Sequence, residues 1–177
     1  MAVGDTNTDD EGIARLVGEA AFRRVHLERL SNQTGSSGEQ TLISSTEDLI
    51  PRPRGAALRV LLGELERSGI SIAGTSFDAI LLPSGSTIDF LDADNVRRLL
   101  PSITFVEIKS TKKPSVREDF GGFFFSLTEK EIEAARQLGD RHIVILQNLV
   151  TGKLLQTSVG EIATRSRSTT WQVSVQL

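Results

Sequence analysis

The chain has 177 residues, of which 38% are hydrophobic and 24% are charged, a composition typical of a globular protein with a buried core. Its formal net charge of −3 argues against a generally basic surface for nucleic acid, although it allows a local basic face. Cysteine is absent, which excludes disulfides, thiolate zinc sites and cysteine nucleophiles.

The N-terminal part is predicted to contain a leader, a helix and a loop. Residues 1–9 are small and polar, which favours a disordered leader. Over residues 10–30, apolar side chains recur at helical spacing and predict an amphipathic helix. Residues 31–45 are rich in Ser, Gly, Thr, Asn and Gln and predict a flexible loop without the lysine of a P-loop. The acidic start lacks an apolar signal segment and no membrane span is predicted, so we expect a cytoplasmic protein.

A basic turn at residues 51–55 leads into a predicted second helix. Residues 56–67 carry leucine and valine at helical spacing, and Gly69 is expected to end the helix. Arg52 and Arg54 in the turn are candidates to contact phosphates of DNA. A solvated loop that merely contains arginine explains them about equally well.

Three strands are predicted next, at residues 70–73, 77–82 and 87–91. Asp78 lies inside an apolar strand, where a carboxylate costs free energy unless something compensates for its burial. Asp89 lies in the shorter, alternating strand and competes with Asp78 for the same role in an acidic site. We favour Asp78 because its strand is longer and more uniformly apolar.

The stretch at residues 103–109 carries the strongest functional pattern. It follows a short predicted helix at residues 95–100, which is capped by the acidic residues before it. Its apolar side chains predict a buried strand, yet Glu107 and Lys109 interrupt it two residues apart and so share one face. A carboxylate holds a hard divalent cation, and an ammonium orients or deprotonates water and offsets charge on a phosphate. The pair indicates metal-assisted cleavage of a phosphodiester, with an exposed cross-strand ion pair as the alternative.

The segment after this strand is basic and then aromatic. Lys112, Lys113 and Arg117 form the densest basic cluster, which suits contact with a DNA backbone or simply a solvated loop. Phe123 and Phe125 predict a core strand more than a platform for stacking bases.

The C-terminal part is predicted to continue the sheet. A capping box at Thr128 predicts a helix that Gly139 ends, and residues 143–149 then form a buried strand. A turn leads to residues 153–155. Residues 171–177 alternate strictly, which predicts an edge strand on this sheet or on a partner subunit.

The combination of Asp78, Glu107 and Lys109 resembles the pattern of the PD-(D/E)XK nuclease superfamily, in which Glu-X-Lys follows an acidic residue after a variable insert. The resemblance covers residues 76–149. A narrower resemblance, to the C-terminal domain of NO VEIN-like proteins and the related Mrr-like restriction endonucleases, rests on Val106–Thr111, Phe123–Glu131, Ala134–Ala135 and Leu138–Asp140.

The resemblance implies an α/β fold with a central mixed β-sheet flanked by helices, the core of restriction endonucleases. Residues 69–177 would form this core and residues 10–68 its N-terminal helical part. It also implies a metal-dependent endonuclease that hydrolyses DNA phosphodiester bonds in restriction, defence or repair, with Mg²⁺ as cofactor and Mn²⁺ as a substitute. DNA and a homodimeric or other protein partner are the implied partners. The alternatives are a catalytically silent DNA-binding or interaction module, and a nuclease for RNA or branched DNA.

Residue roles also follow from the resemblance. Asp78, Glu107 and the backbone carbonyl of Ile108 would bind the metal, and Lys109 would position or activate water. A glutamate on the first helix joins the metal site in several superfamily members, and Glu19 is the candidate here. A solvated helix face with Glu19 paired to a neighbouring arginine is the better interpretation of that residue.

Overall fold

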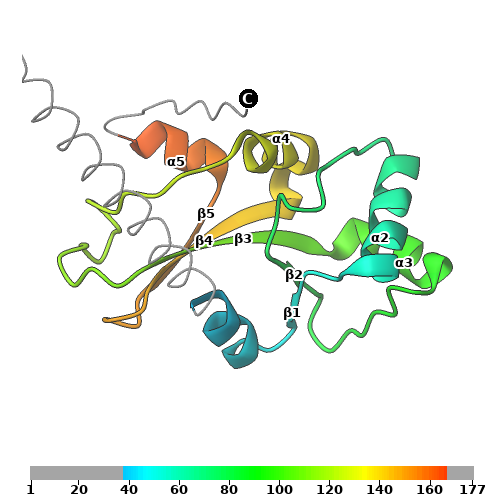
Figure 1. Ribbon diagram of the computed structural model, residues 1–177, viewed down its shortest axis with the longest axis horizontal. Helices are drawn as coiled ribbons and strands as arrows, with labels where there is room; N and C mark the ends of the chain where they lie inside the picture. Colours follow the sequence, from blue (N-terminus) through cyan, green and yellow to red (C-terminus); the bar gives the residue numbers. More distant parts are fainter. Residues whose placement is uncertain (1–37, 167–177) are drawn as a thin grey trace, which may run out of the picture.

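The computed structural model describes residues 38–166 of the chain. The predicted leader, the helix at residues 10–30 with Glu19, and the edge strand at residues 171–177 lie outside the described residues. Figure 1 shows the described part as one sheet with helices packed against it.

The described part begins with a helix at residues 38–45. The elements that follow are β1 (Leu49–Pro51), α2 (Gly55–Arg67), β2 (Ala79–Leu81), α3 (Ala93–Leu99), the 3₁₀-helix η1 (Leu100–Ser102), β3 (Thr104–Thr111), α4 (Glu129–Leu138), the 3₁₀-helix η2 (Gly139–Arg141), β4 (His142–Asn148), β5 (Leu154–Thr157) and α5 (Val159–Arg165).

The five strands form one sheet in the order β1-β2-β3-β4-β5. Strands β3 and β4 are parallel and are joined by a crossover that contains α4. The other neighbouring strands are antiparallel. The sheet is therefore mixed and flanked by helices, and the predicted α/β fold class is confirmed.

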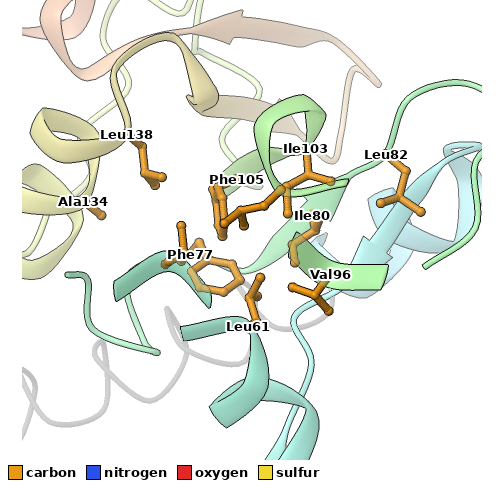
Figure 2. Packing of buried hydrophobic residues seen from close by; sticks show 11 residues of the cluster. Leu61, Phe77, Ile80, Leu82, Val96, Ile103, Phe105, Ala134 and Leu138 are labelled. Carbon is orange, nitrogen blue, oxygen red and sulfur yellow. The ribbon is translucent and has the colours of Figure 1, made fainter. Parts of the chain in front are cut away.

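Each face of the sheet is covered by its own set of apolar contacts, since successive strand residues point to opposite faces. On one face, Val106 and Ile108 of β3 pack with Leu42 of the helix at residues 38–45. On the other face, Phe105 packs with side chains of α2, α3 and α4, and Figure 2 shows this cluster around Phe77 and Phe105. The two rings meet edge to face with centroids 5.0 Å apart. In Figure 1, α4 and α5 lie on the side of the sheet opposite the helix at residues 38–45.

Several predicted elements are confirmed together with their caps. Helix α2 spans nearly the predicted residues, and β3 and β4 contain the predicted apolar strands. The side chain of Asp92 accepts hydrogen bonds at the start of α3, and Thr128 forms the expected capping box with Glu131. No helix within the described ranges has the length and apolarity needed to cross a membrane.

Three predicted strands are wrong, because residues 70–73, 87–91 and 123–125 have no strand structure. Individual apolar side chains of the first two segments are partly buried against the core cluster around Phe77, without any strand pairing of their backbone. Phe123 and Phe125 do pack against a cluster on β4, as expected, but they do so from an irregular segment. Apolar alternation predicted which side chains are buried, whereas a strand also requires a neighbouring strand to pair with.

The predicted flexible loop at residues 31–45 is wrong over residues 38–45, which are helical. Leu42 is only 3% exposed, so burial of an apolar side chain stabilises a helix that its polar composition does not favour. Strand β1 and helix α5 were not predicted. Strand β1 has three residues, and α5 begins with a capping box between Ser158 and Glu161.

Candidate active site

Glu107 and Lys109 project from one face of β3, as their spacing predicts. Oε1 of Glu107 lies 2.7 Å from Nζ of Lys109, and the side chains are only 4% and 16% exposed. A shielded ion pair of this kind interacts more strongly than one in water, because the effective dielectric constant is lower. The alternative of an exposed cross-strand ion pair does not describe this geometry.

Asp78 lies directly before β2 and faces the same part of β3. Strand β2 begins at Ala79, which pairs with Val106, so Asp78 directly precedes the paired residues. The N–H of Asp78 donates to the carbonyl of Val106 at 2.8 Å, and the N–H of Ile108 donates to Oδ2 of Asp78 at 2.9 Å. The negative charge of Asp78 also raises the pKa of Glu107, so the two carboxyl groups lie within electrostatic reach of each other. The structure thus brings Asp78, Glu107 and Lys109 together.

Asp89 occupies a different setting from the strand that was predicted for it. It is exposed in the turn before α3, where its Oδ1 accepts from the N–H of Leu91 at 2.9 Å. Its own N–H donates to Oδ1 of Asn95 at 3.1 Å. These local hydrogen bonds make Asp89 a turn residue, and it has no described contact with Asp78 or Glu107.

The electrostatic environment of Glu107 disfavours a negative charge. Burial first, and then the charges of Asp78 and Glu131, raise the pKa of Glu107 to about 9, although Lys109 acts in the opposite direction. For Lys109, burial acts to lower the pKa, but the carboxylates of Glu107 and Glu131 outweigh it and the pKa is raised. A negative charge on Glu107 is therefore costly in the free protein, and a bound cation would reduce that cost.

Glu131 belongs to this site although the sequence argument used it only as a helix cap. Its side chain is 8% exposed, and Oε1 lies 3.1 Å from Nζ of Lys109. A signal for this position exists in the sequence. Glu131 precedes Ala134 by three residues and Leu138 by seven, so it shares the apolar stripe of α4 that faces the core.

Glu39 is a second acidic residue that the sequence argument missed, because its segment was predicted to be a loop. Its helix starts against β3, where a Cβ atom on Gly38 would overlap the hydroxyl of Ser110. Burial raises the pKa of Glu39 first, and the negative charge of Asp78 raises it further. A carboxylate on a helix therefore lies within electrostatic reach of Asp78. Glu19 was the sequence-based candidate for a helix glutamate that joins the metal site. The only sequence signal is Leu42 three residues after Glu39, at helical spacing.

Some of the predicted DNA-binding residues are exposed and form no ion pair with another described residue, whereas others contact the protein itself. Lys112 and Lys113 are exposed directly after β3 and form no ion pair with another described residue. Arg54 is also exposed, whereas Nη1 of Arg52 donates to the carbonyl of Phe77 at 3.0 Å. Arg117 is 3.2 Å from Asp119 in a surface ion pair.

The acidic residues suit a hard divalent cation such as Mg²⁺, because every available donor is an oxygen. Asp78 and Glu107 supply two carboxylates within electrostatic reach of each other. The N–H of Ile108 faces Asp78, so its carbonyl points to the same edge of β3. No group of three or more Asp, Glu, His or Cys side chains within residues 38–166 is arranged to hold a metal. Mg²⁺ keeps several waters and commonly uses one or two carboxylates plus substrate phosphate, so two carboxylates fit it.

Comparison of the chain with protein-family models, curated proteins and solved structures finds no match. The resemblance to the PD-(D/E)XK superfamily therefore rests on the residues of the chain.

Proposed function

We propose that this protein is a metal-dependent endonuclease that hydrolyses DNA phosphodiester bonds. The observation that carries the proposal is that Asp78, which accepts a hydrogen bond from the N–H of Ile108, lies within electrostatic reach of Glu107, whose carboxyl group lies 2.7 Å from the ammonium of Lys109. Two acidic side chains and one lysine close together at a shielded part of β3 match the requirements of phosphodiester hydrolysis. We place the protein in the cytoplasm, where such an activity would serve restriction, defence or repair.

Each residue has a separate task in this proposal. Asp78, Glu107 and the carbonyl of Ile108 hold the cation, and Glu39 is a further carboxylate within electrostatic reach of Asp78. Mg²⁺, with Mn²⁺ as a substitute, supplies Lewis-acid stabilisation of the charge on the phosphate. Lys109 lies against two carboxylates, which keep it cationic, so it orients water and offsets phosphate charge.

The exposed lysines after β3 are placed to contact phosphates of the DNA backbone. Lys112 and Lys113 follow Lys109 by three and four residues, which keeps their ammonium groups near the end of β3. Phosphate contacts from such residues contribute affinity without sequence preference. Arg54 on the β1–α2 turn is another exposed candidate.

The experiment that tests the proposal is cleavage of plasmid and linear DNA with Mg²⁺ or Mn²⁺ by wild type and Lys109→Ala. We expect cleavage by wild type and a loss of about 100-fold or more in Lys109→Ala, because the charge that stabilises the phosphate is removed. Lys130→Ala is the matched control, since Lys130 is exposed on α4, and it should cleave like wild type. Equal cleavage by wild type and Lys109→Ala would contradict the site.

A catalytically silent DNA-binding module is the second candidate. It is favoured by one observation, that the carboxylates of Asp78 and Glu107 already have partners within the protein. DNA binding without Mg²⁺ binding, measured by calorimetry, would support this candidate. Linear, nicked and branched DNA and RNA offered side by side would identify the substrate of an active enzyme.

A further inference from the structure

Lys109 is held by two carboxylates that come from different elements. Its Nζ lies 2.7 Å from Oε1 of Glu107 on β3 and 3.1 Å from Oε1 of Glu131 on α4. All three side chains are at most 16% exposed, so water competes weakly for these contacts. One ammonium with two shielded acceptors keeps a partner when either acceptor is engaged elsewhere.

The carboxylate of Glu131 is fixed independently of Glu107. Its Oε2 accepts a hydrogen bond from the N–H of Thr128 at 2.7 Å, while its own N–H donates to Oγ1 of Thr128 at 3.3 Å. One oxygen thus belongs to the capping box of α4, and the other faces Lys109. The position of this carboxylate is set by the start of the helix.

We propose that Glu131 is a positioning residue that holds the ammonium of Lys109 in place when Glu107 binds a cation. The inference rests on the proposed function, because it assigns a role within the same site. An ammonium beside Glu107 competes with a divalent cation for that carboxylate, and the two positive charges repel each other. Glu131 supplies a second anchor, so that Lys109 stays beside the cation instead of swinging into solvent.

Acylation of lysine side chains, quantified by mass spectrometry, tests this anchoring without requiring DNA cleavage. Glu107→Gln represents a Glu107 whose carboxylate is engaged by a cation, because the amide cannot form an ion pair with Lys109. Glu131→Gln removes the charge but keeps the capping box, since glutamine also serves at this helix position. The exposed Lys112 and Lys113 provide internal references in every sample.

We expect Lys109 to react slowly in wild type, in Glu107→Gln and in Glu131→Gln, because each keeps at least one of the two carboxyl partners of Lys109. In the double variant Lys109 should react about tenfold faster and approach the rate of Lys112, because both charge-assisted contacts are lost. Fast reaction of Lys109 in Glu107→Gln alone would overturn the proposal, and so would slow reaction in the double variant.

Thr128→Ala separates positioning from helix capping. It removes the hydroxyl half of the capping box and leaves the carboxylate of Glu131 in place. Lys109 should stay slow to react in this variant even where thermal unfolding shows lower stability. Fast reaction there would mean that Glu131 acts only through the helix start, and it would overturn the proposal.

Cleavage kinetics add a readout that a purely structural role would not give. With a wild type that cleaves DNA, Glu131→Gln should lower kcat about 10- to 100-fold and leave KM within about twofold, because a displaced lysine affects the transition state. An unchanged kcat would overturn the positioning role. A wild type that cleaves nothing would count against the proposed function, while acylation would still decide whether Glu131 anchors Lys109.

Discussion

Glu107 shows how a single position can indicate chemistry. It is only 3% exposed, and its carboxylate adjoins another acidic residue, Asp78, and the ammonium of Lys109. A glutamate that served only the fold would be better replaced by an apolar side chain, since burying a charge costs free energy. Its presence in a buried strand is therefore explained best by a ligand that the folded protein binds.

The raised pKa of Glu107 predicts how stability depends on pH. A folded-state pKa of about 9, against an ordinary value of 4.5, means that the folded protein retains a proton that the unfolded chain releases. The stability contributed by this proton is full below pH 4.5 and is lost as pH rises through about 9. In metal-free buffer, wild type should lose up to about 1.4 kcal/mol per pH unit relative to Glu107→Gln across this window. Urea unfolding of both proteins at several pH values is the measurement, and parallel curves would contradict the assignment.

The helix at residues 38–45 shows how one element changes the composition of the site. Its sequence is rich in polar residues, and only Leu42 and Ile43 form an apolar face. That face packs against the sheet surface that carries Val106 and Ile108, and it brings Glu39 within electrostatic reach of Asp78. Tertiary packing, rather than helix propensity, stabilises this element.

Leu42→Ala tests this packing. Removing a buried leucine side chain should lower the free energy of unfolding by about 2–5 kcal/mol, because the transfer free energy is lost and a cavity remains. Ser44→Ala on the same helix is the control, since Ser44 is exposed and should change stability by less than about 0.5 kcal/mol. Urea unfolding measures both variants. Equal stability of Leu42→Ala and Ser44→Ala would show that the helix does not contribute to the core.

Within the whole molecule, β4 pairs with both β3 and β5 and starts with a buried histidine. His142 is 2% exposed and pairs in register with Phe105 of β3. Neither ring nitrogen has a hydrogen-bond partner of good geometry within residues 38–166, although the backbone of Ser76 is close enough to raise the pKa of His142. Burial lowers the pKa of His142, and the nearby groups offset this only in part. The histidine is thus neutral in the folded protein at neutral pH.

Acid should unfold the protein partly through His142. Because its folded-state pKa is lowered from 6.5, the unfolded chain binds a proton that the folded chain excludes, and stability falls as pH drops below 6.5. His142→Phe should reduce this loss by up to about 1.4 kcal/mol per pH unit just below that value. Thermal unfolding between pH 5 and pH 8 provides the comparison. An identical acid dependence in the variant would exclude His142 as the cause.

The sequence by itself determined the local features of this protein. The alternation around Glu107 and Lys109 predicted a buried strand with both side chains on one face, and the structure has that strand. The capping box at Thr128 and the apolar run after Asp78 were equally readable. These features depend on geometry within a few residues along the chain, and that geometry is the same in any fold.

Only the tertiary structure decided which side chains meet. The approach of Asp78 to Glu107 depends on how β2 pairs with β3, and the contact of Glu131 with Lys109 depends on how α4 packs over the sheet. Glu39 reaches Asp78 because burial of Leu42 holds a helix where composition predicted a loop. Apolar alternation in turn predicted strands that lack a partner strand. Pairing and packing link residues far apart in sequence, and no local pattern specifies them.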